Sequence, residues 1–203
     1  MKLTQKTMTM TALFVLIAAW AFAGGISTED RSKAISHLSN TRDLLLKTVK
    51  NLNDEQLNYK PSAESWSIAE CVEHIAVSEE LIFAMAQGTL KEAVDASTET
   101  SLAFSDDQLV QVITDRSQKV QTREEFKPTN KYDSYKGSLK AFKAKRKSNI
   151  DYLKGTQDEL RNHYFQFPFG TADTYQVLLF MSAHSKRHIL QIEEIMGSAG
   201  FPD

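Results

Sequence analysis

Ala183-His184-Ser185-Lys186-Arg187-His188-Ile189 places two histidines four residues apart in a chain of 203 residues. Apolar residues recur on both sides of this stretch at helical spacing, which predicts a long amphipathic helix. Because positions i and i+4 share one face of a helix, both imidazoles are predicted to point toward the core. Such a pair supplies two metal ligands from one rigid element. Two buried histidines satisfied by hydrogen bonds would give the same pattern.

Four long stretches of the chain share this periodicity, at residues 27–49, 67–88, 134–154 and 173–197. Apolar residues three and four positions apart give each of them one buried stripe. Ser67-Ile68-Ala69-Glu70 has the Ser-x-x-Glu pattern of a capping box, which marks the start of a helix. Four long helices joined by short to medium connections predict an all-α fold, a four-helix bundle.

A stretch between the second and third long helices has a capping pattern of its own. Ser105-Asp106-Asp107-Gln108 precedes the apolar Leu109, and we expect a short extra helix from here to about Gln121. No alternation of apolar and polar residues indicates a strand anywhere in the chain. The expected fold is therefore a bundle with one short helical insert.

The first 23 residues are expected to be a secretory signal peptide, followed by one domain at residues 24–203. Lys2 and Lys6 give a positive start, an apolar run covers residues 12–23, and Ala21-Phe22-Ala23 resembles a cleavage site. The apolar run is shorter than the roughly 20 residues that span a bilayer. We therefore expect cleavage, a periplasmic or secreted protein, and no stable membrane anchor. An uncleaved N-terminal anchor is the alternative.

Charge and cysteine content narrow the class of protein further. Cleavage removes two lysines and no acidic residue, which leaves 22 basic and 26 acidic side chains and changes the net charge from −2 to −4. This mild acidity argues against a nucleic-acid partner, which requires a basic surface. The lysine-rich face of the third long helix is expected to be solvated rather than to bind an acidic partner. Cys71 is the single cysteine, so no internal disulfide is possible.

A metal site needs a third ligand, and His74 is the best candidate among the remaining histidines. It borders the apolar stripe of the second long helix, where a side chain can reach a groove between helices. His37 is expected at the surface, and His163 is expected to pack locally in the loop before the last helix. Cys71 is expected to be a buried thiol rather than a ligand. Glu73 is expected to face away from the site.

Two motifs resemble the sequence signatures of the DinB-like superfamily. Residues 64–75, Glu64-Ser65-Trp66-Ser67-Ile68-Ala69-Glu70-Cys71-Val72-Glu73-His74-Ile75, are similar to its W-S-I-x-E-x-x-x-H-[LI] motif. Residues 183–192 are similar to its H-x-x-R-H-x-x-Q-I motif, and the resemblance spans residues 28–197. It implies an up-down-down-up four-helix bundle and a divalent metal ion, whether nickel, zinc, iron or manganese. The ion would be held by three histidines, which correspond to His74, His184 and His188.

The resemblance also implies a choice of functions. Characterised members of the superfamily include metal-dependent thiol transferases that use bacillithiol or mycothiol, and a mycothiol-dependent maleylpyruvate isomerase. Three histidines leave a position open for water or a small-molecule substrate, which favours a metal-dependent hydrolase or thiol S-transferase. A non-catalytic metal-binding or stress-related protein is the alternative. Glu70 and Gln191 are near the ligands in sequence, but no residue is assigned a catalytic role. A homodimer is expected, because related bundles often pair through helix faces.

Overall fold

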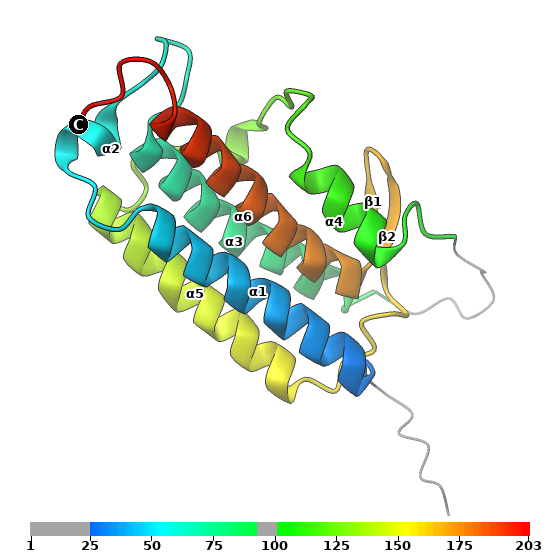
Figure 1. The fold of residues 1–203 in the computed structure, drawn as a ribbon. Helices are drawn as coiled ribbons and strands as arrows, with labels where there is room; N and C mark the ends of the chain where they lie inside the picture. Colours follow the sequence, from blue (N-terminus) through cyan, green and yellow to red (C-terminus); the bar gives the residue numbers. More distant parts are fainter. Residues whose placement is uncertain (1–24, 93–100) are drawn as a thin grey trace, which may run out of the picture.

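The computed structural model describes residues 25–92 and 101–203, so the expected signal peptide lies outside the described residues. Its largest elements are four long helices: α1 (Thr28–Thr48), α3 (Ile68–Thr89), α5 (Tyr135–Gly155) and α6 (Thr174–Met196). Helices α1 and α6 run in one direction, and α3 and α5 run in the other (Figure 1). Each of these four helices contacts two of the others, in the cyclic order α1, α6, α3, α5. The predicted all-α, up-down-down-up four-helix bundle is confirmed.

Three of the bundle helices begin at side chains that the sequence marks as caps. Ser27, Ser67 and Asp173 each accept a hydrogen bond from the main-chain amide three residues later. Glu70 returns a bond to the amide of Ser67, which completes the predicted capping box of α3. These bonds satisfy amides that have no partner inside the helix, so they fix where each helix starts.

The short extra helix, α4 (Asp106–Thr114), packs against α6. It begins at the predicted cap, Ser105, but ends at Thr114 rather than near Gln121. The carboxylate of Asp115 accepts hydrogen bonds from the amide and hydroxyl of Ser117, at 2.8 and 2.9 Å. This side-chain turn competes with the next helical turn, which explains why the predicted end was too late.

A β-hairpin precedes α6, although the sequence predicts no strand. Strand β1 (Tyr164–Phe167) pairs antiparallel with β2 (Gly170–Asp173). Each strand has four residues, too few for an alternating pattern to be recognised. Gly170 turns the chain with a φ of +122°, and a Cβ there would lie 2.7 Å from the Cβ of Ala103. Both the backbone angle and the close approach therefore require glycine.

Two smaller elements complete the described part of the chain. Helix α2 (Asp54–Asn58) follows α1, and the 3₁₀ helix η1 (Glu124–Phe126) precedes α5. Among the described residues, no helix combines the length and the apolarity that crossing a bilayer requires.

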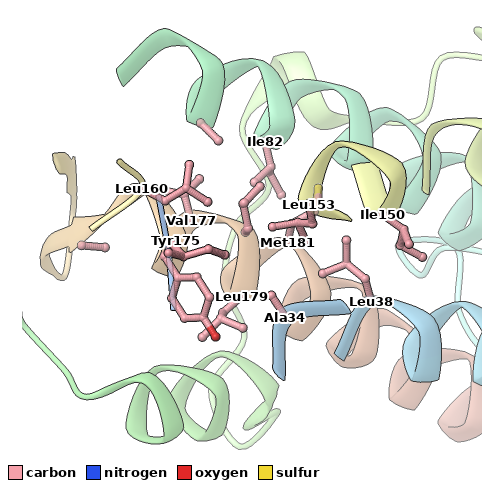
Figure 2. Close-up of a cluster of buried hydrophobic side chains, with 14 of the residues drawn as sticks. Ala34, Leu38, Ile82, Ile150, Leu153, Leu160, Tyr175, Val177, Leu179 and Met181 are labelled. Carbon is pink, nitrogen blue, oxygen red and sulfur yellow. The ribbon is translucent and has the colours of Figure 1, made fainter. Parts of the chain in front are cut away.

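The bundle interior contains two apolar clusters with a polar layer between them. The first cluster fills the end where α6 begins and includes Leu38, Ile82, Leu153, Tyr175 and Met181 (Figure 2). The second fills the end where α6 finishes and includes Leu45, Val72, Ile75, Phe142 and Ile189. Polar side chains lie between the two sets along each helix: Thr41, Glu79, Arg146, Asn149 and Ser185. The apolar clusters supply most of the driving force for folding.

Arg146 is the centre of the polar layer, and its side chain is fully buried. Its guanidinium forms a two-point ion pair with Glu79, with both N–O distances at 2.7 Å. It also donates to the carbonyl oxygen of Leu38 and to the hydroxyl of Ser185, both at 2.8 Å. Asn149 donates to the same Glu79 carboxylate at 2.8 Å. These bonds join all four bundle helices at one level, and Ser185 directly follows His184 in α6.

Candidate metal centre

The three histidines singled out from the sequence lie together inside the bundle. His74 comes from α3, and His184 and His188 come from successive turns of α6. The Nε2 atom of His74 lies 3.0 Å from Nε2 of His188 and 3.4 Å from Nε2 of His184. His74 is only 1% exposed, deeper than the border position expected for it. The ring of Trp66 packs on its imidazole, with 4.8 Å between the ring centroids.

Hydrogen bonds at the far side of two rings determine which nitrogen carries the proton. The Nδ1 of His74 lies 2.7 Å from the carbonyl oxygen of Phe126, and a carbonyl can only accept. The Nδ1 of His188 lies 2.9 Å from the amide oxygen of Gln191. Both rings therefore carry their proton on Nδ1 when neutral, and their Nε2 lone pairs face each other across 3.0 Å. Two acceptors cannot bond to each other, so this arrangement calls for a cation between them.

The spacing of the nitrogens also fits a metal ion. Two ligand nitrogens about 2.1 Å from one ion, at angles of about 90–110°, lie about 3.0–3.4 Å apart. The Nε2 separations of 3.0 and 3.4 Å fall in this range, and candidate ligand atoms from all three residues lie within 4.8 Å of one another. Neutral imidazole suits zinc, nickel and iron, and the divalent ions overlap in the sites they accept. The geometry therefore supports a divalent ion without choosing which one.

Burial keeps the three imidazoles in the neutral form that a metal requires. It lowers the pKa of His74 to about 4, even though the bond to the Phe126 carbonyl acts in the opposite direction. Burial also lowers the pKa of His184 and of His188 well below the usual value, and the neighbouring histidines lower both further. Because a protonated imidazole cannot bind a metal ion, these shifts keep the site competent at neutral pH.

Comparison with known proteins places the chain in a family. The family model of the DinB superfamily matches residues 37–192, most of the chain. The chain belongs to the DinB superfamily. It is 28% identical to the uncharacterized protein YuaE of Bacillus subtilis (strain 168) over 148 residues, which cover 72% of this chain and 87% of YuaE.

One solved structure of similar fold is that of YfiT from Bacillus subtilis, with a TM-score of 0.56 and 18% identity. The similarity covers 85% of this chain and 89% of YfiT. YfiT is described as "a probable metal-dependent hydrolase with an unusual four-helix bundle topology". At this level of identity the likeness shows that the two chains share a fold.

The connection between α4 and α5 covers the histidines of this DinB superfamily member, and we call residues 115–134 the crossover segment. Its η1 helix supplies the Phe126 carbonyl that binds His74. Glu73 holds the next part, because one carboxylate oxygen accepts from the amides of Thr129 and Lys131 at 2.9 and 2.7 Å. Glu73 is thus buried, not facing away as the sequence suggested. Its partners are main-chain amides, which leave no pattern in a sequence.

Arg187 anchors the start of the crossover segment to α6, between the two histidines of that helix. Its guanidinium donates to the carbonyl oxygens of Ile113, Asp115 and Gln118. Burial and the nearby charge of Arg116 lower the pKa of Arg187, although the charges of Asp115 and Glu194 act in the opposite direction. The segment and α6 enclose a cleft of about 470 Å³ that reaches His188 and Trp66. Water and small molecules thus have a route to the candidate site.

The other residues considered from the sequence have different roles. Cys71 is buried in the second apolar cluster, where burial raises its pKa to about 12, and it lies outside the histidine group. His37 lines a separate cavity of about 240 Å³ between α1, α4 and α6, and His163 bonds through Nδ1 to the carbonyl of Thr89 at 3.0 Å. Glu70 uses its two oxygens for Lys60 and the Ser67 amide. Of Cys71, Glu70 and Gln191, only Gln191 contacts one of the three histidines, His188.

Proposed function

We propose that this protein is a hydrolase that depends on a divalent metal ion held by His74, His184 and His188. One observation carries the proposal: two imidazoles with protonated Nδ1 atoms direct their Nε2 lone pairs at each other, 3.0 Å apart. The Nε2 of the third imidazole, His184, lies 3.4 Å from Nε2 of His74. The description of YfiT as a probable metal-dependent hydrolase supports the same chemistry.

The cleft supports an enzyme over a protein that only stores metal or is stabilised by it. Structural metal sites are usually closed by four protein ligands, whereas catalytic sites keep one position open. Cys71, the residue best placed in the sequence to be a fourth ligand, lies outside the histidine group. The cleft beside His188 gives a small-molecule substrate access to the position that the three histidines would leave open on the ion.

The chain's own residues prepare the site for this role. The Phe126 carbonyl and Gln191 hold the rings of His74 and His188 so that their Nε2 atoms point inward. Trp66 covers His74 and packs near His188, which limits the number of waters that reach the rings. When bound, a divalent ion would polarise a substrate oxygen and lower the pKa of water. Nickel, zinc, iron and manganese are the candidate ions.

Elemental analysis of the purified protein, together with an ester hydrolysis assay, tests this proposal. Wild-type protein should bind about one ion per chain. His74→Ala, His184→Ala and His188→Ala should each lose metal and hydrolysis yet stay helical by circular dichroism, because the apolar clusters do not involve these rings. His37→Ala should keep both, since His37 lies outside the group. Equal metal content in all five proteins would refute the site, and metal binding without hydrolysis would favour the storage role.

A further inference from the structure

The cleft beside His188 is lined by more positive than negative charge. Arg116, Lys119 and Arg187 line it together with two acids, Glu64 and Glu194. Arg116 holds Glu194 in a two-point ion pair, with both N–O distances at 2.7 Å, so these two charges offset each other. The other charged residues that line the cleft are one acid, Glu64, and two bases, Lys119 and Arg187.

Lys119 and Arg187 form no ion pair with a carboxylate in the described part of the chain. Arg187 donates to main-chain carbonyls, which fix its position but do not neutralise its charge. The bond from Arg187 to the carbonyl of Gln118, at 2.6 Å, also places Lys119 at the rim of the cleft. Arg187 directly precedes His188 in α6, so the positive charge lies beside the proposed ligand. A divalent ion on three neutral imidazoles would make the cleft still more positive.

Building on the proposed hydrolase, we propose that the substrate is a small molecule carrying a carboxylate or phosphate group that binds Lys119 and Arg187. A cavity of about 470 Å³ is in the range of small-molecule sites, roughly 300–1,000 Å³. Trp66 gives the cleft an apolar surface near His188, suited to the carbon skeleton of such a molecule. The reacting group then faces His188 while the anionic group stays at the rim.

Fluorescence of Trp66 tests anion binding without any need for turnover. Trp20 and Trp66 are the two tryptophans, so Trp20→Phe in the full chain leaves Trp66 as the single reporter, inside the cleft. Glutarate and glycerol 3-phosphate are the anionic probes, and glutaramide is the neutral one. We expect both anions, or one of them, to bind at least about tenfold more tightly than glutaramide. The tighter anion identifies carboxylate or phosphate as the preferred group.

Substitution at the rim separates this site from general attraction to the metal. Lys119→Gln should raise the dissociation constant of the preferred anion about fivefold and leave glutaramide unchanged. Lys143→Gln, at an exposed position on α5, removes the same charge far from the cleft and should change neither constant. Equal affinity for anionic and neutral probes, no saturable change with either anion, or no effect of Lys119→Gln would each overturn the inference.

Hydrolysis distinguishes a failure of this inference from a failure of the proposed function. Lys119→Gln should raise the KM for mono-p-nitrophenyl glutarate and leave its kcat, and both constants for p-nitrophenyl acetate, unchanged. Hydrolysis of both esters with no dependence on Lys119 would keep the hydrolase and remove the anionic substrate. Absence of hydrolysis for both would count against the hydrolase, while the Trp66 titration still decides whether the cleft selects anions.

Discussion

The three histidines of the candidate site differ in how firmly their rings are held. His74 is tied to the Phe126 carbonyl and His188 to Gln191. The Nδ1 of His184 is enclosed and has no hydrogen-bond partner in the described part of the chain. Its orientation therefore depends on packing, including the ring of Phe180, whose centroid lies 5.8 Å away. A metal ion bound at Nε2 would fix the orientation of this ring, which no hydrogen bond at Nδ1 holds.

Metal-free protein should become less stable as the pH falls from 6.5 toward 4, with His74 as one cause. The pKa of His74 is about 4 in the folded protein, against 6.5 for a solvated imidazole, so the unfolded chain binds the proton first. The contribution of His74 to the free energy of unfolding is fully present above pH 6.5. About 3 kcal/mol of this contribution is lost by about pH 4. Urea denaturation at several pH values measures this loss.

His74→Phe isolates the contribution of one ring, because it removes the titrating group and keeps an aromatic side chain. Its stability should fall less steeply with acid than that of the wild type. The comparison matters because burial raises the pKa of Asp173 to about 6, which acts with the opposite sign over the same pH range. Identical pH dependence in the two proteins would contradict a buried neutral His74.

The grouping of the three histidines was within reach of the sequence, whereas their surroundings were not. His184 and His188 are four residues apart, so local helical geometry alone puts them on one face. The burial of His74 depends on Phe126, which is 52 residues away and contributes only a main-chain carbonyl. Glu73 was misjudged for the same reason, since an acid on a helix normally faces water unless distant amides bind it.

At the scale of elements, the crossover segment depends on Glu73 for its position over the site. Glu73→Leu should lower the free energy of unfolding by about 2 kcal/mol, because two amides lose a charged acceptor. Metal affinity should fall about tenfold, since the Phe126 carbonyl would no longer be held against His74. Trypsin should also cut faster within the segment, at Arg123.

Glu80→Leu is the matched control on the same helix. Glu80 binds the ammonium groups of Lys131 and Lys145 at 3.0 Å, but its side chain is 40% exposed. Surface pairs of this kind contribute less than about 1 kcal/mol. The effect on stability and on trypsin cleavage should therefore be small, and a larger loss for Glu80→Leu than for Glu73→Leu would contradict the role given to Glu73.

The long helices were predictable because their caps and stripes are local features. Ser67, Ser105 and Asp173 act through the residue three positions later, so a short window of sequence contains the whole signal. The hairpin was not predictable, because its strands are short. Asp115, which ends α4, resembles any other acid in an exposed helix until its bonds to Ser117 are seen.

At the scale of the whole molecule, the polar layer should matter more for stability than its size suggests. Glu79→Leu leaves the fully buried charge of Arg146 unpaired and should cost about 3–5 kcal/mol. The double variant Glu79→Leu, Arg146→Met removes both charges and should recover much of that loss. Urea denaturation measures both, and a double variant less stable than the single one would contradict this account.

Export is a further proposal at this scale. The charged start, the apolar run and Ala21-Phe22-Ala23 predict cleavage before Gly24. Protein recovered from its native periplasmic or extracellular fraction should have the intact mass of a chain that begins at Gly24. The mass of a chain that still includes Met1 would rule out cleavage.

The homodimer also stays a prediction. Sedimentation at tens of micromolar protein would decide it, and a monomer at that concentration would contradict it.

The parallel run of α3 and α5 has a consequence for how such a protein can diverge. Because α5 starts at the end of the bundle opposite to where α3 finishes, the intervening chain must travel back about 33 Å, the length of a 22-residue helix. That obligatory return passes over the histidines and forms one wall of the cleft. Substitutions in the returning chain alone could therefore change which small molecules bind in the cleft. The bundle, which provides the apolar clusters and carries the three histidines, would stay unchanged.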